Sequence, residues 1–221
     1  HTPGDNGDND AGGDSGGGTV DFTLPEELRR AVEDLAAHHA VTPYTVHAAA
    51  FALLLARCTD SYDFGLGTIW ANRQLAGTED LVGFLVNTLP LRCDLTGDPS
   101  FTDLLASLGA RIQRLSAHQD VPLAEVVRAA GGPRTGDENP LFRALFNYRA
   151  TALPALGDGE EAWVPSHDTS ITGTPRGVAK SELGLTLAPD GTGLRGVLEY
   201  QTHVLDADTA RSVHARTAGW A

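Results

Sequence analysis

Apolar residues recur at helical spacing near the start of the chain and again from residue 46. The segment Thr23–Glu26 has the form of a capping box, in which Thr23 caps a helix and Glu26 reaches back. The apolar stripe that predicts this amphipathic helix is Leu24, Leu28, Val32 and Leu35. Residues 46–56 are apolar on nearly all sides and follow a Thr42-Pro43 start, which predicts a central buried helix.

Three further helices are expected later in the chain. Ser100 and Asp103 form another cap, and the stripe that follows is Phe101, Leu104, Leu105, Leu108, Ile112 and Leu115. Asp120–Pro122 has the composition of a cap and first turn, and it predicts a helix that ends at Gly131-Gly132. Asp206 is the expected cap of a last helix.

Strands are expected between these helices. The expected ranges are 64–70, 85–95, 142–148, 183–187 and 194–201, with the last two paired around an Asp190-Gly191 turn. Strands and helices alternate without an internal repeat, so the predicted fold class is α/β with a mixed sheet flanked by helices.

Residues 1–19 form a tract of Gly, Asp and Asn without apolar periodicity, which predicts a disordered, solvated linker before an ordered domain over 20–221. Asp8, Asp10 and Asp14 do not follow the order of an EF-hand loop, and no Glu closes the loop, so calcium binding is not expected.

Composition narrows the classes of function. The net charge of -13 over 221 residues argues against a nucleic-acid partner. No apolar run of about 18 residues is present, so a membrane span is not expected.

Cys58 and Cys93 are too few for a disulfide framework and lack the spacing of zinc ligands. The two cysteines therefore indicate reduced thiols in a cytoplasmic protein, and no metal site is expected. The absence of Met indicates a segment of a longer translation product.

Three short segments carry the strongest functional signal. They read LVGFLVNT at 81–88, HQDVP at 118–122 and NPLFR at 139–143. In this order and spacing they resemble the last three signature motifs of nonribosomal peptide synthetase condensation domains, roughly (I/V)GxFVNT, HQDxPFE and (R)NPLFQ. Residues 67–73 resemble the family's GTPxxGR segment, and residues 180–183 and 193–202 resemble its closing segments.

This resemblance implies the C-terminal lobe of a chloramphenicol-acetyltransferase-like fold. In such domains two lobes form a tunnel, and donor and acceptor peptidyl carrier proteins deliver thioesters on phosphopantetheine arms for amide-bond formation. The lobe itself would bind no cofactor directly, and its first partner would be the N-terminal lobe. The catalytic HHxxxDG motif belongs to that other lobe: His38 and His39 are followed here by Pro43 and Tyr44, where the motif requires Asp and Gly. No catalytic residue is therefore expected in this half.

Several polar and aromatic residues are candidates for the tunnel wall. Asn87 could donate to the thioester carbonyl or could hold two loops together as a structural amide. Trp70 and Asn72 replace the family's usual residues and would change the shape of the tunnel. For Arg73 and Arg92, surface ion pairs are the expected role.

The resemblance places His118, Gln119 and Asp120 in the floor of the tunnel. Without it, Asp120 is a helix N-cap and His118 ends the preceding helix. The family's Phe-Glu after the Pro is Leu123-Ala124 here, so the packing of the floor is expected to differ.

Two other functions stay open from the sequence. The lobe could be a catalytically degenerate platform that docks carrier proteins or tailoring enzymes, or part of a related acyltransferase with a hydroxyl acceptor. In every case the isolated chain is expected to form no peptide bonds, because HHxxxDG is missing.

Overall fold

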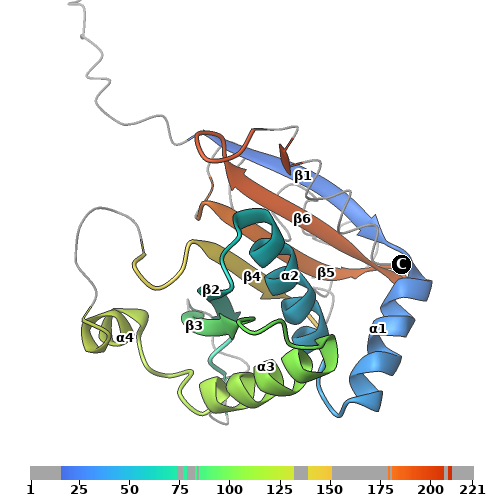
Figure 1. Cartoon of the computed structure of the whole chain (residues 1–221), viewed down its shortest axis with the longest axis horizontal. Helices are drawn as coiled ribbons and strands as arrows, with labels where there is room; N and C mark the ends of the chain where they lie inside the picture. The colour runs from blue at the N-terminus through green and yellow to red at the C-terminus, as the bar shows by residue number, and fades with distance from the viewer. Residues whose placement is uncertain are drawn as a thin grey trace, which may run out of the picture.

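Six strands form one mixed sheet in the order β1-β6-β5-β4-β2-β3 (Figure 1). The computed structural model describes residues 16–73, 77–78, 83, 85–131, 139–150, 179, 181–206 and 209–210. The strands are β1 (Gly17–Leu24), β2 (Asp63–Trp70), β3 (Asn87–Asp94), β4 (Ala144–Tyr148), β5 (Leu183–Asp190) and β6 (Gly193–Gln201). Strands β2, β4 and β5 run parallel, whereas β1, β6 and β3 each pair antiparallel with their neighbours. The predicted mixed α/β class is confirmed.

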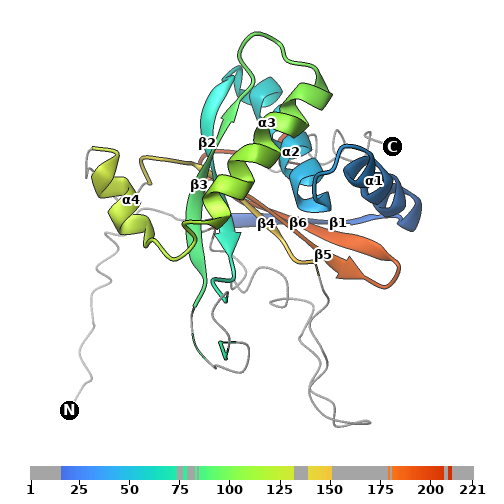
Figure 2. The ribbon, with the colours of Figure 1, turned by 90° about the horizontal axis from the view of Figure 1, so that it is seen from below.

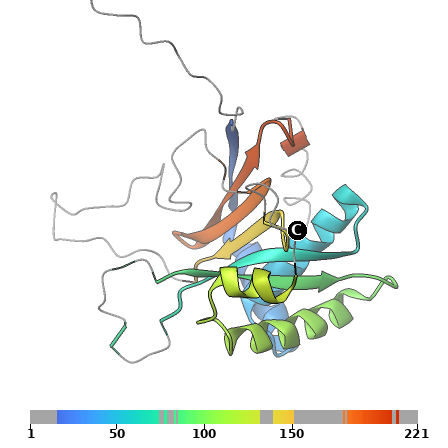
Figure 3. The same ribbon diagram turned by 90° about the vertical axis from the view of Figure 1, so that its left-hand side faces the viewer.

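Within the described residues, four helices lie between the strands: α1 (Glu26–His38), α2 (Pro43–Thr59), α3 (Phe101–Ser116) and α4 (Leu123–Ala129). Figure 2 shows α1, α2 and α3 on one face of the sheet. Helix α4 lies apart from the other three helices in Figures 1 and 2 and in front of the β2–β3 pair in Figure 3, and it contains no fully buried residue.

Helix α2 is the centre of the core, as its apolar sequence predicts. Thr42 caps it, because its hydroxyl accepts a hydrogen bond from the Thr45 amide at 3.2 Å, and Pro43 occupies the first turn. Phe51 is completely buried and its ring lies 6.0 Å from that of Phe146 on β4. The Ser100 cap of α3 is also present: the Asp103 backbone amide donates to the Ser100 hydroxyl at 3.2 Å, and that hydroxyl donates to the Asp103 carboxylate at 2.6 Å.

The expected helix start at Thr23 is wrong. Thr23 and Leu24 belong to β1, opposite Arg195 and Leu194 of β6, and α1 begins after Pro25 without a side-chain cap. Pairing with a strand about 170 residues later overrides the local capping pattern. The strand begins at Gly17, three residues before the expected boundary, and residues 1–15 lie outside the described part.

The expected Asp120 cap is wrong as well. Pro122 is the N-cap of α4, with no side-chain hydrogen bond, and Asp120 is exposed in the turn before it. Asp206 does act as a cap, since its carboxylate accepts from the Thr209 amide at 2.7 Å. Residues 151–178 and Lys180, the first residue of the 180–183 segment, lie outside the described part of the chain.

Among the described helices, none is by itself long and apolar enough to cross a membrane. Helices α1 and α2 reach the required length and composition only when taken together, and they are bent by 105° at their junction.

Candidate functional site

The candidate site lies at one end of the sheet, which we call the carboxyl edge. It comprises the ends of the parallel strands β2 and β4, the start of β3, and the turn 117–122 after α3. Trp70, the last residue of β2, pairs with Asn87, the first of β3. The register of β4 against β2 brings Tyr148 to the same edge. Clefts at the carboxyl ends of strands are the usual ligand sites of open α/β sheets.

Asn87 joins β3 to the turn 117–122. Its side-chain amide donates to the carbonyl oxygens of Gln119 at 2.9 Å and Val121 at 2.6 Å, and its Oδ1 accepts from the Thr88 amide at 3.0 Å. Both N–H groups are therefore engaged by backbone carbonyls. These contacts are those of a structural amide that holds two loops together.

The three residues of the HQD segment occupy different environments. Gln119 is buried and donates to the Ser116 carbonyl at 3.1 Å, which fixes the turn against the end of α3. His118 and Asp120 on either side are exposed. The segment therefore supplies one internal anchor and two side chains that face solvent.

Trp70 is half-buried at the end of β2, and its indole N–H has a hydrogen-bond partner within the chain. It donates to the Thr68 hydroxyl at 2.9 Å, and Thr68 in turn donates to the Leu89 carbonyl at 2.9 Å. The Tyr44 ring lies 6.4 Å from the indole. The Tyr44 hydroxyl is buried near Thr68 without a hydrogen bond of normal geometry, and burial raises its pKa.

Asn72 and Arg73 shape the chain just after β2. Asn72 has a φ of 51°, in the left-handed region where Gly is favoured and Asn is the best-tolerated alternative. This explains why Asn can stand where the resembled motif has Gly. The Arg73 guanidinium donates to the backbone carbonyl of Thr78, within the connection that leads towards β3.

Arg92 does not belong to the carboxyl edge. It lies near the other end of the β2–β3 pair and forms a bidentate ion pair with Asp63, at 2.8 and 2.6 Å. The expected ion pair is thus present. The hydrogen bond from Arg92 lowers the pKa of the Asp63 carboxyl group. Both side chains are exposed, and exposed ion pairs add little to the stability of a fold.

An aromatic cluster that the sequence pattern did not predict lies behind this edge. The rings of Tyr44 and His47 on α2 approach Tyr148 on β4, at 6.4 and 5.3 Å. His47 is buried, and burial lowers its pKa to about 4. The i, i+3 spacing of these two helical residues was a detectable signal, but their partner lies about 100 residues away.

The described part of the chain offers no group of three or more His, Cys, Asp or Glu side chains that could hold a metal ion. At the carboxyl edge, the donors of Asn87, Trp70 and Gln119 all have partners within the chain. The arrangement can shape a wall and hold loops in place, and no nucleophile paired with a base occurs among these residues.

Comparison with known proteins gives the family. A family model described as a condensation domain matches residues 5–217. Malpibaldin synthetase of Mortierella alpina is 33% identical over 193 residues, which cover 87% of this chain and 3% of that protein. Phosphinothricin tripeptide synthetase PhsC of Streptomyces viridochromogenes is 34% identical over 203 residues, with 89% and 18% covered. The chain spans less than a fifth of either relative.

Solved structures agree on the fold. The condensation domain from the monacolin K polyketide synthase MokA superposes with a TM-score of 0.75 at 20% identity, covering 98% of this chain and 49% of that one. The X-domain from teicoplanin biosynthesis gives a TM-score of 0.75 at 22% identity, with 92% and 46% covered. This chain therefore has about half the length of the solved domains it matches. By the family match over nearly its whole length, the chain belongs to the condensation domain family.

Proposed function

We propose that this chain is the C-terminal lobe of a nonribosomal peptide synthetase condensation domain. Paired with an N-terminal lobe that carries HHxxxDG, it would form amide bonds between carrier-bound aminoacyl or peptidyl thioesters. One observation carries the proposal: the family match covers residues 5–217, yet the chain lacks HHxxxDG and covers only about half of solved condensation domains.

In this reaction the acceptor amine attacks the thioester carbonyl, the C–N bond forms, and the C–S bond breaks to release the donor thiol. The proton lost by the amine goes to a base, which the family's motif places in the other lobe. Holding both thioesters in one tunnel makes the attack effectively intramolecular. The described residues of the carboxyl edge suit a wall and a floor rather than acid–base chemistry, because the Asn87 and Trp70 donors are engaged internally.

The partners follow from the same proposal. The carboxyl edge would face the N-terminal lobe, and the carrier proteins would bring their phosphopantetheine arms into the tunnel from opposite sides. No cofactor would be held by this lobe itself. We further propose that the parent protein is cytoplasmic.

The test compares the isolated lobe with the two lobes together. Loaded donor and acceptor carriers are incubated with this chain, with the N-terminal lobe, or with both co-expressed, and dipeptidyl carrier is measured by mass spectrometry. We expect product only when both lobes are present. Turnover by this chain alone would refute the proposal, as would inactive co-expressed lobes whose HHxxxDG motif is intact and which form a stable complex.

A second candidate is a non-catalytic docking platform. One solved neighbour is the X-domain of teicoplanin biosynthesis in complex with OxyB, with a TM-score of 0.76 at 22% identity, a likeness that shows the fold alone. A broken HHxxxDG motif in the parent protein, together with retention of a tailoring enzyme on the immobilised parent, would favour this platform over the transferase.

A further inference from the structure

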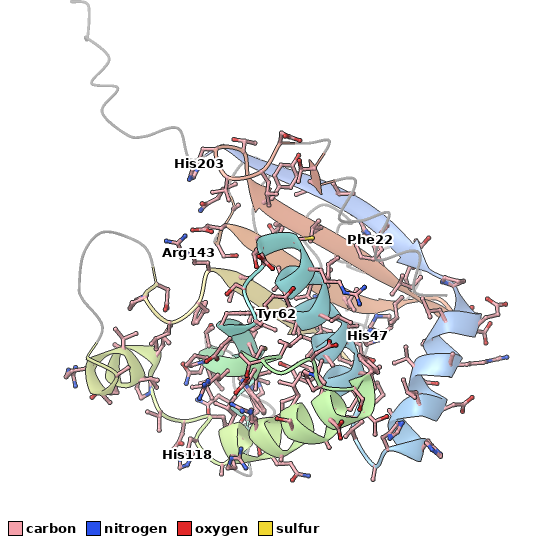
Figure 4. The ribbon with its side chains drawn as sticks, viewed as in Figure 1. Phe22, His47, Tyr62, His118, Arg143 and His203 are labelled. Carbon is pink, nitrogen blue, oxygen red and sulfur yellow. The ribbon has the colours of Figure 1, made fainter. Side chains whose placement is uncertain are left out.

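A cavity of about 1080 Å³ opens at the opposite end of the sheet, where β2, β4 and β5 begin. The last turns of α2, the start of β2, residues 139–144, the start of β5 and Val204–Leu205 line it. Arg143 in its lining lies far from His118 at the carboxyl edge (Figure 4). None of the residues assigned to the proposed reaction lines this cavity.

The lining combines a broad apolar surface with two arginines. Its apolar part consists of Leu54, Leu55, Phe64, Phe142, Leu183 and Leu205. Val204 at the same site is 44% exposed, and it is one of four large hydrophobic residues that are exposed in the described part of the chain. An apolar cavity of this size with a few polar groups has the character of a ligand pocket.

The charged residues of the lining favour an anion. Arg143 lies 3.4 Å from Glu182, so these two charges largely offset each other. Arg57 makes no hydrogen bond or ion pair within the part of the chain that the structure describes, and it is exposed. With two arginines and one glutamate, the lining carries a net positive charge, whereas the whole chain carries -13.

We propose that this cavity binds a free fatty acid, with the aliphatic chain on the leucine and phenylalanine surface and the carboxylate on Arg57. A planar guanidinium binds a carboxylate through two parallel hydrogen bonds, and burial of the methylene chain supplies most of the affinity. A small anion would lack the apolar contact, and a neutral alcohol would lack the charge-assisted hydrogen bonds with Arg57. Binding here is independent of amide-bond formation.

Cys58 provides a native reporter of occupancy. It lines the cavity and is exposed, whereas Cys93 is completely buried. Decanoate below its micellar concentration is titrated into the purified chain by calorimetry, and the rate of Cys58 alkylation is followed in parallel. We expect saturable binding that slows alkylation, and no such protection by acetate.

Arg57→Gln tests the carboxylate contact, and Arg30→Gln is the matched control, because Arg30 is an exposed arginine on α1 outside the cavity. We expect Arg57→Gln to weaken decanoate binding roughly fivefold or more and to leave decanol binding unchanged. Arg30→Gln should have no effect on the binding of either ligand. Absence of saturable decanoate binding, equal effects of the two substitutions, or unprotected Cys58 at saturation would each overturn the proposal. Because the readout is binding by this chain alone, its failure leaves the proposed amide-forming function untouched.

Discussion

The backbone of Gly65 on β2 lies directly against the backbone of Leu141 in the NPLFR segment. A Cβ atom placed on Gly65 would lie only 1.8 Å from the Leu141 carbonyl oxygen. At Gly67, two residues later, a Cβ would lie 2.6 Å from the Phe142 ring. The two glycines therefore leave room for the 141–142 segment to pack on the sheet, which brings two of the family-like motifs together.

Gly65→Ala should lower the free energy of unfolding of the chain by about 2–3 kcal/mol, because a backbone oxygen cannot move aside as a side chain can. Urea unfolding followed by circular dichroism measures the change. The control is Gly83→Ala, since a Cβ there meets nothing within 4 Å. Equal stabilities of the two variants would show that the 141–142 segment is not held against β2.

Asn87→Ala should lower the free energy of unfolding by about 2–3 kcal/mol, because two backbone carbonyls lose their donors.

Asn87→Asp keeps the acceptor for the Thr88 amide but places a carboxylate against the same two carbonyls. Those carbonyls would raise the pKa of the new carboxyl group, so this variant should lose stability as the pH rises through that pKa. Unfolding at pH 4.5 and 7.5 tests both variants. His118→Ala, which removes an exposed neighbour, should be nearly neutral.

His47 should make the stability of the fold sensitive to acid. Its pKa is lowered to about 4 in the fold from 6.5, so between these values the unfolded chain binds more protons. The stability linked to His47 is therefore complete above about pH 6.5 and is lost as the pH falls towards 4, by at most about 3 kcal/mol.

Urea unfolding between pH 7 and pH 4.5 measures this slope. His47→Phe should flatten it, while His118→Gln, at an exposed histidine, should leave it unchanged. A parent slope that survives in His47→Phe would assign the acid sensitivity to other groups.

The two thiols should differ sharply in reactivity. Burial raises the pKa of Cys93 to about 12, whereas Cys58 is exposed. Because the thiolate is the reactive form, Ellman's reagent at pH 8 should titrate one thiol in the native chain and two in urea. Cys58→Ser should remove the fast native reaction. Rapid modification of two native thiols would contradict the burial of Cys93.

Several elements could be predicted from local pattern. The helix over residues 43–59 follows from a Thr-Pro start and an apolar run, and the β5–β6 pair follows from two apolar strands around Asp190-Gly191. Each of these signals lies within one short stretch of chain, where propensity and periodicity act together. The family-like motifs are equally local, and the comparisons confirm the family they indicated.

In two places the local pattern predicted the wrong structure. Strand β1 contains Gly, Thr and Asp and overlaps a capping pattern, yet pairing with β6 makes it an edge strand. Asp120 has the composition of an N-cap, but the turn before α4 places Pro122 in that position. In both cases the tertiary contact outweighs the local preference.

By itself, the sequence determined the helices and strands with strong periodicity, the family, and the absence of the HHxxxDG motif. The tertiary structure decided that Asn87 holds a turn 32 to 34 residues away, and that Arg92 sits apart from the carboxyl edge. It also decided that Arg57 borders an apolar cavity. The physical reason is that contacts between residues far apart in the chain produce no local periodic pattern in the sequence. Their distances and burial in the fold decide which polar groups form hydrogen bonds within the chain and which remain exposed to solvent.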